Sequence, residues 1–113
     1  MILRVLQIIA VIGTILTGLF SLIRPRAVKG FTGLSAESGR GITEIRAILG
    51  GVFVALGAAP LILNAPAAYQ MLGITYLVVA GTRAVSMFVD RSVVQSNIIS
   101  LVVEIVFGVL LVL

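Results

Sequence analysis

Val5 to Ile23 reads VLQIIAVIGTILTGLFSLI, an almost uninterrupted apolar run. A helix rises 1.5 Å per residue, so a helix of this length is about 28 Å long, close to the roughly 30 Å hydrocarbon thickness of a bilayer. A signal peptide has an apolar core of about 7 to 15 residues and a small-residue cleavage site, whereas this run ends in Arg24-Pro25-Arg26. The run therefore predicts an uncleaved membrane-spanning helix over residues 2–23.

The composition of the whole chain supports the same class of protein. Its 113 residues are 60% hydrophobic and 11% charged, whereas soluble domains are about 25% charged. The net charge is +4, but the sequence has no basic patch with interleaved aromatics, which nucleic-acid binding needs. We therefore expect no nucleic-acid partner. Histidine and cysteine are absent, which removes the usual zinc and haem ligands and the thiolate nucleophiles. We expect no metal, no cofactor and no enzyme activity.

Three more spanning helices are predicted, at about residues 43–63, 67–88 and 92–113. Pro25 ends the first helix, and the connection that follows is either a linker at the headgroup level or a binding loop. Asn64-Ala65-Pro66 and Asp90-Arg91 form the other two turns. Residues 1–113 are thus expected to form a single transmembrane domain, an all-α integral membrane four-helix up-and-down bundle in contact with the lipid bilayer.

Small residues mark the faces on which these helices are expected to pack, because association in lipid depends on close backbone approach. On the second helix they recur every fourth residue, at Ala47, Gly51, Ala55 and Ala59. Similar residues follow one stripe of the first helix and recur in the third, at Gly13, Thr14, Thr17, Gly18, Ser21, Gly73, Ala80, Gly81 and Ala84. These faces exceed what one bundle needs, which predicts homo-oligomerisation or assembly into a larger membrane complex.

The segment from Gly41 to Gly51 combines charge, a helix start and two glycines. Thr43 is predicted to cap the second helix, and Glu44 lies in the first turn, where the helix dipole favours a carboxylate. Arg46 is carried into the apolar run. The two charged residues either belong to a site or simply cap the helix and anchor it at the headgroups.

Arg83 and Glu104 lie deeper in the predicted spans. Counted from Ser92, Glu104 is about 20 Å from the surface, level with Thr75 and Tyr76, and Gln7 and Thr14 of the first helix are within reach. Arginine reaches toward its nearer interface, so a direct pair requires Arg83 to bend against that preference, and Glu104 is expected to be protonated unless water or Arg83 reaches it. An ionisable residue at this depth is a functional candidate, with structural hydrogen bonding as the alternative. Five residues form the candidate ligand-binding pocket, which contains no catalytic residue: Glu44, Arg46, Tyr76, Arg83 and Glu104.

Lysine and arginine predict the orientation in the inner (plasma) membrane, since cytoplasmic loops carry more of them. The first and third connections hold Arg24, Arg26, Lys29, Arg40 and Arg91, whereas the opposite side has Arg4. The loops between helices 1 and 2 and between helices 3 and 4 are therefore expected in the cytoplasm, with both termini outside.

Several motifs together resemble a family of small bacterial four-helix membrane proteins of unknown function. They are Thr43-Glu44-Ile45-Arg46-Ala47 before Gly50-Gly51, Arg83 ahead of Asp90-Arg91, and Glu104 with Gly108. The chain departs from that pattern at Leu49, where an aromatic is expected. A looser likeness, in size and helix count, is to the DoxX group, some of whose members partner quinone-linked oxidoreductases, which implies a lipophilic partner.

Three functions remain open from the sequence. The favoured one is binding of a lipophilic or amphipathic small molecule, or assistance to a larger membrane complex, through the polar pocket. The second is a small proton-coupled transporter that uses Glu104, although the chain has no tryptophan and few aromatics to line such a site. The third is a purely structural membrane subunit whose polar residues set helix register.

Overall fold

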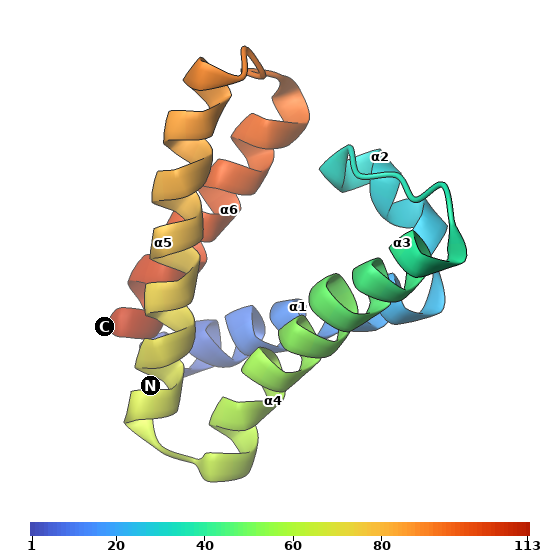
Figure 1. Cartoon of the computed structure of the whole chain (residues 1–113). Helices are drawn as coiled ribbons and strands as arrows, with labels where there is room; N and C mark the ends of the chain where they lie inside the picture. The colour runs from blue at the N-terminus through green and yellow to red at the C-terminus, as the bar shows by residue number, and fades with distance from the viewer. The chain divides into compact units, whose positions relative to one another are not determined.

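The computed structural model describes all residues 1–113, and every regular element in it is a helix (Figure 1). In chain order these are α1 (Ile2–Ile23), the 3-10 helix η1 (Pro25–Val28), α2 (Lys29–Thr32), α3 (Gly39–Glu44), the π-helix η2 (Ile45–Val52), α4 (Phe53–Leu63), α5 (Pro66–Val89) and α6 (Gln95–Val112). Because α3, η2 and α4 follow one another without a break, they form one long helix. The predicted all-α class is confirmed.

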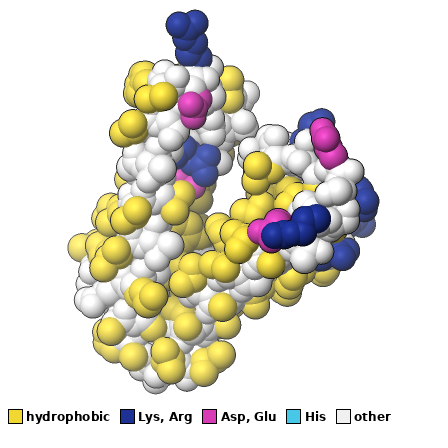
Figure 2. Space-filling view, in the orientation of Figure 1, with side chains coloured by type: hydrophobic (Ala, Val, Ile, Leu, Met, Phe, Trp, Pro, Cys, Tyr) yellow, Lys and Arg dark blue, Asp and Glu magenta, His cyan; other side chains and the backbone are white.

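Four helical stretches are long and apolar enough to cross a membrane, namely Ile2–Ile23, Gly39–Leu63, Pro66–Val89 and Gln95–Val112. The shortest has 18 residues, which gives a length of about 27 Å. The chain is a multi-pass membrane protein with four candidate spans, compatible with a four-helix membrane bundle. In Figure 2 hydrophobic side chains cover much of the visible surface, as lipid contact requires.

The chain divides into two compact units. Residues 1–7 and 65–113 form the first, which we call the hairpin unit, and residues 8–64 form the second, the N-terminal unit. Helix α1 therefore begins in the hairpin unit and continues in the N-terminal unit.

Helices α5 and α6 pack along each other in the hairpin unit, joined by a turn in which Arg91 has a φ of 52°. Their close approach rests on Gly73, because a Cβ atom there would lie 2.9 Å from the carbonyl oxygen of Gly108. Gly81, also predicted as a packing residue, instead has open space around it. The prediction of a close small-residue contact is thus right for Gly73 and wrong for Gly81.

In the N-terminal unit, α1 packs against the long helix through glycines on both sides. A Cβ atom at Gly18 would lie 2.8 Å from the carbonyl oxygen of Gly50, and one at Gly57 would lie 3.1 Å from that of Val11. Three residues of the stripe predicted on α1 are buried, namely Thr14 at 1% exposure, Gly18, and Ser21 at 0%.

The contact face predicted for the long helix is wrong, since Ala47, Gly51 and Ala55 are exposed. The reason is the π-helix η2, which places more residues in each turn than the 3.6 of an α-helix. The buried positions step from Ile45 to Gly50, a spacing that a uniform α-period does not produce. A contact face predicted with the spacing of an α-helix therefore lies on the wrong side of the long helix.

The start of the long helix also differs from the prediction. Ser38, and not Thr43, caps it, with its side-chain oxygen accepting a bond of 3.2 Å from the backbone N–H of Gly41. The Thr43 hydroxyl instead donates to the carbonyl oxygen of Gly39. The connection before it, expected as a loop, holds the short helices η1 and α2, because Pro25 suits the first position of a helix.

Candidate functional site

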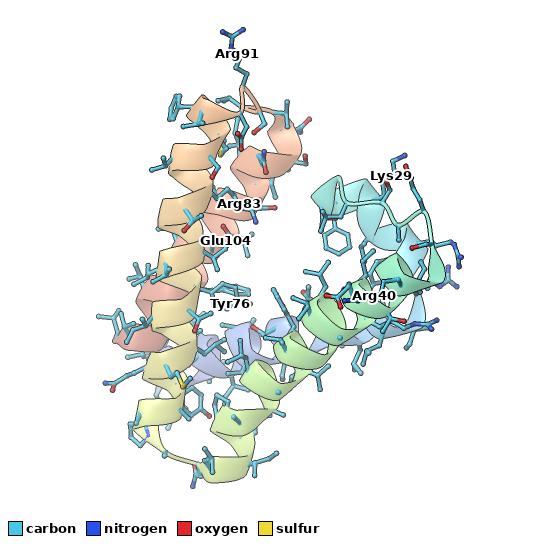
Figure 3. The ribbon with its side chains drawn as sticks, in the orientation of Figure 1. Lys29, Arg40, Tyr76, Arg83, Arg91 and Glu104 are labelled. Carbon is cyan, nitrogen blue, oxygen red and sulfur yellow. The ribbon has the colours of Figure 1, made fainter.

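Arg83 of α5 and Glu104 of α6 form a two-pronged ion pair within the hairpin unit (Figure 3). The Nε atom of Arg83 donates to Oε1 of Glu104 at 2.8 Å, and its Nη2 atom donates to Oε2, also at 2.8 Å. Glu104 is only 8% exposed. Both oxygens of a buried carboxylate are thus satisfied by one planar guanidinium, the geometry for which arginine is suited.

Asn97 completes this cluster and was not among the predicted site residues. Its Oδ1 atom accepts a bond of 2.9 Å from Nη1 of Arg83, and its Nδ2 atom donates to the carbonyl oxygen of Ser92, also at 2.9 Å. Asn97 and Glu104 are seven residues apart, about two helical turns, so they share one face of α6. That spacing was the available signal for including Asn97.

The expectation that Arg83 would turn toward its nearer interface is wrong. Residues Ser92 to Val94 form part of the turn, so α6 begins at Gln95, three residues later than the predicted start. Glu104 is therefore nine residues, or about 14 Å, into its helix, and Arg83 is six residues, or about 9 Å, from the end of α5. The long Arg83 side chain spans the remaining difference in depth between the two residues. The Glu104 carboxylate then accepts the hydrogen bonds that water would accept at the interface.

The neighbours predicted for Glu104 by depth have other interactions. Thr75 donates its hydroxyl to the carbonyl oxygen of Met71, and Gln7 donates to that of Leu110. The ring of Tyr76 stands edge-on to Phe107, with ring centres 5.6 Å apart and planes at 86°. Tyr76 is two helical turns from Arg83 on α5, so this aromatic contact continues the α5–α6 seam beyond the ion pair.

A groove of about 410 Å³ opens beside Arg83 in the hairpin unit. Its walls combine the apolar side chains of Val78, Val79 and Met87 with six polar residues, which are Thr82, Arg83, Ser86, Asp90, Ser92 and Asn97. Three of the five N–H groups of the guanidinium donate to Glu104 and Asn97. The other two have no acceptor in the protein and are available to a bound molecule.

Glu44 and Arg46, the other two predicted site residues, lie in the N-terminal unit and have separate partners. Glu44 pairs with Arg40 one turn earlier on α3, and both side chains are exposed. The Nε atom of Arg46 donates to the carbonyl oxygen of Leu22 at 3.1 Å. That carbonyl belongs to the last turn of α1, where carbonyl oxygens have no backbone N–H donor within the helix. Both residues therefore fit the anchoring and capping interpretation.

One comparison with known proteins finds a match. A family model described as a domain of unknown function (DUF4345) matches residues 2–113, almost the whole chain. No curated protein and no solved structure matches the chain. The resemblance to a family of unknown function is supported in this respect, whereas no link to the DoxX group is found.

Proposed function

Since the chain belongs to the DUF4345 family, a domain of unknown function, we propose its function from the groove beside Arg83. The protein binds a lipophilic molecule there, with the polar head of that molecule against the guanidinium. The observation that carries this proposal is that Arg83, which keeps two unused N–H donors, lines a groove together with both polar and apolar side chains. The activity is binding, without catalysis.

The size and lining of the groove support a small molecule as the occupant. Ligand pockets measure about 300 to 1,000 Å³ and combine apolar walls with a few placed polar groups. The groove, at about 410 Å³, lies within this range. Val78 and Val79 supply an apolar wall for a hydrocarbon tail, whereas Ser86 and Arg83 supply polar contacts for the head.

The charge balance favours a neutral head that accepts hydrogen bonds. Glu104 already compensates the charge of Arg83, and Asp90 adds a carboxylate to the same lining. An anionic head would meet no surplus positive charge and would face Asp90. A carbonyl or ester oxygen accepts from the two unused N–H groups at no such cost.

Binding of monoolein, a neutral lipid with an ester carbonyl and hydroxyl groups, tests this proposal. The protein in a neutral detergent is titrated with monoolein, oleate or oleylamine, and bound lipid is measured by native mass spectrometry. Ser86→Leu fills the groove without touching the ion pair, and Ser96→Leu is the matched control, because Ser96 is exposed and outside the groove lining. We expect preference for monoolein and at least about tenfold weaker binding in Ser86→Leu alone. Equal binding by the two variants contradicts the proposal.

The ion pair supports a second candidate, a purely structural membrane subunit. Arg83, Glu104 and Asn97 join α5 to α6 through three side-chain hydrogen bonds, which set the register of the two helices. If Ser86→Leu leaves lipid binding unchanged while Arg83→Ala unfolds the protein, this reading is preferred. A proton-coupled transporter has less support, since both oxygens of Glu104 are engaged by Arg83; proton-driven flux in proteoliposomes that disappears in Glu104→Gln would revive it.

The orientation in the inner membrane is part of the proposal. The first and third connections, which together hold five of the eight arginine and lysine residues, face the cytoplasm, and both termini lie outside. The chain has no cysteine, so single cysteines at Lys29 and Asn64 report on one side each. We expect a membrane-impermeant thiol reagent to label Asn64→Cys, and not Lys29→Cys. The cells used have an intact inner membrane, and the cell envelope outside that membrane has been removed. The reverse pattern overturns the orientation.

A further inference from the structure

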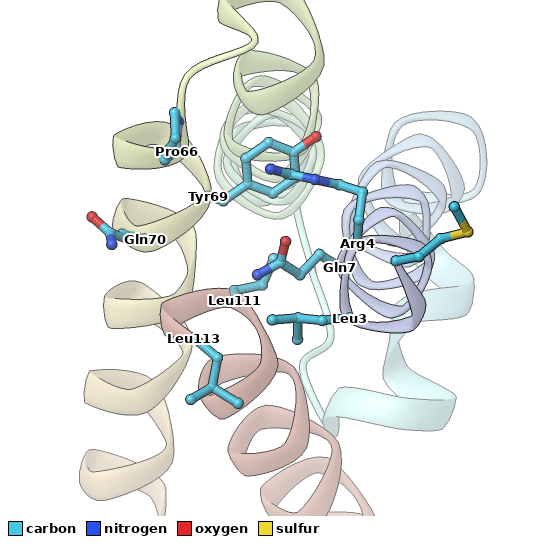
Figure 4. A pocket seen from close by; sticks show the side chains of 9 residues that line it. Leu3, Arg4, Gln7, Pro66, Tyr69, Gln70, Leu111 and Leu113 are labelled. Carbon is cyan, nitrogen blue, oxygen red and sulfur yellow. The ribbon is translucent and has the colours of Figure 1, made fainter.

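A second pocket, of about 250 Å³, lies in the hairpin unit where the first turns of α1 and α5 meet the last turn of α6 (Figure 4). Arg4, Gln7, Tyr69 and Gln70 supply its polar side chains. The rest of the lining is apolar and consists of Met1, Leu3, Pro66, Leu111 and Leu113. None of these residues has an acidic side chain, which distinguishes this pocket from the groove beside Arg83.

Arg4 is held in place by an aromatic ring. Its guanidinium lies over the ring of Tyr69, 4.5 Å from the ring centre. Stacking of this kind uses the flat face of the guanidinium and leaves the N–H groups at its edge directed outward. The structure gives Arg4 no ion pair and no hydrogen bond from its side chain, since the two salt bridges involve Arg40 and Arg83. Arg4 is thus a positioned cation with unused donors.

Gln7 adds an acceptor to the same pocket. Its side chain is 7% exposed and is oriented by a 2.9 Å bond from Nε2 to the carbonyl oxygen of Leu110. This bond turns the amide oxygen toward the side of the pocket where Arg4 and Tyr69 lie (Figure 4). A molecule in the pocket therefore meets charged donors from Arg4 and a fixed acceptor from Gln7. An oxyanion that also carries hydroxyl groups satisfies both.

The position along the helices indicates where such a group comes from. Arg4 and Tyr69 belong to the first turns of two spanning helices, which is the level of the membrane interface where aromatic residues gather. Lipid phosphates lie at this level. The pocket is smaller than the roughly 300 to 1,000 Å³ of pockets that enclose a whole ligand, so it suits a headgroup whose chains remain in the bilayer.

We propose that this pocket binds a phosphate oxyanion in a hydroxyl-bearing phosphodiester, the headgroup chemistry of phosphatidylglycerol. The phosphate oxygens accept from the edge of the Arg4 guanidinium, and a headgroup hydroxyl donates to the amide oxygen of Gln7. This site is separate from the groove beside Arg83. It selects an anionic headgroup, whereas that groove selects a neutral one, because Arg83 is neutralised by Glu104 and Arg4 is not.

Lipid binding by three forms of the protein tests the proposal. The wild type, Arg4→Gln and Arg91→Gln are titrated in neutral detergent with phosphatidylglycerol, phosphatidylcholine or inorganic phosphate, and bound lipid and thermal unfolding are measured. Arg91→Gln is the matched control, since it removes one exposed positive charge from the turn after α5. We expect phosphatidylglycerol to bind and stabilise the wild type and Arg91→Gln. Its apparent affinity for Arg4→Gln should be at least about tenfold lower, because a charged hydrogen-bonded contact is lost.

Several outcomes overturn the proposal. Equal loss of affinity in Arg4→Gln and Arg91→Gln would mean that only net charge matters, and equal binding of phosphatidylcholine would remove the role of the hydroxyls. Full stabilisation by inorganic phosphate alone would overturn the assignment to a lipid. Tyr69→Phe keeps the ring and should bind as the wild type does, whereas Tyr69→Leu should weaken binding. Circular dichroism checks that each variant retains its helices.

Discussion

Gly73 of α5 and Gly108 of α6 face each other across the seam of the hairpin unit. A Cβ atom at Gly108 would lie 3.2 Å from the carbonyl oxygen of Gly73 and 2.6 Å from Cδ2 of Leu77. A Cβ atom at Gly73 would meet the carbonyl oxygen of Gly108 in the same way. The two glycines thus set how closely the helices approach, and they bring Arg83 within reach of Glu104.

Gly73→Ala is expected to destabilise the protein, because the added methyl group meets backbone that cannot move aside. Overpacking of this kind costs about 1 to 3 kcal/mol. Gly81→Ala on the same helix is the control, since its surroundings are open and alanine favours a helix by up to about 1 kcal/mol over glycine. Unfolding in a denaturing-detergent titration, followed by circular dichroism, measures both. Equal stability of the two variants would show that the seam is not tightly packed.

Removing Arg83 alone should destabilise the protein more than replacing both Arg83 and Glu104 by apolar residues. Arg83→Ala leaves a buried carboxylate without its partner, which costs about 3 to 5 kcal/mol. Arg83→Met combined with Glu104→Leu removes both charges and should recover most of that loss, because an apolar pair needs no compensation. The same unfolding titration gives the free energies. A double variant as unstable as Arg83→Ala would mean that the pair is not the source of the effect.

Gly18→Ala should destabilise the packing of α1 against the long helix. Its Cβ atom would lie 2.7 Å from the backbone nitrogen of Val54, whereas a Cβ atom at Gly51 would meet nothing closer than 3.9 Å. We expect a loss of about 1 to 3 kcal/mol for Gly18→Ala and no loss for Gly51→Ala. Thermal unfolding in detergent distinguishes them. The opposite order would restore the contact face at Gly51 that an unbroken α-helix predicts.

Glu44→Gln is expected to change little. Its only ion pair is with Arg40, and both side chains are exposed, with relative accessibilities of 53% and 75%. Exposed pairs of this kind contribute about 0 to 1 kcal/mol. The free energy of unfolding should therefore shift by less than about 1 kcal/mol, and monoolein binding should be unchanged. A loss of monoolein binding in Glu44→Gln would return this residue to the candidate site.

The sequence identified two of the most informative residues, and the structure assigned their partners. Arg83 and Glu104 could be singled out because an ionisable side chain in a span is costly wherever it lies. Their pairing could not, because it depends on where α6 begins, and a three-residue difference at that end changes the depth of Glu104 by about 4.5 Å. Asn97 was missed although its seven-residue spacing from Glu104 puts both on one face of α6, and only the structure shows that it contacts Arg83.

The sequence by itself determined the class of the protein and the number of its spans. Bilayer thickness imposes a length on every spanning helix, and apolar runs of that length are visible without any tertiary information. Only the tertiary structure decided which faces and which charges meet. The π-helix η2 moves the contact face of the long helix from Gly51 to Gly50, and Arg4 lies over the ring of Tyr69 and forms no ion pair. Such relationships depend on local helix geometry and on residues far apart in the chain, which composition and periodicity do not contain.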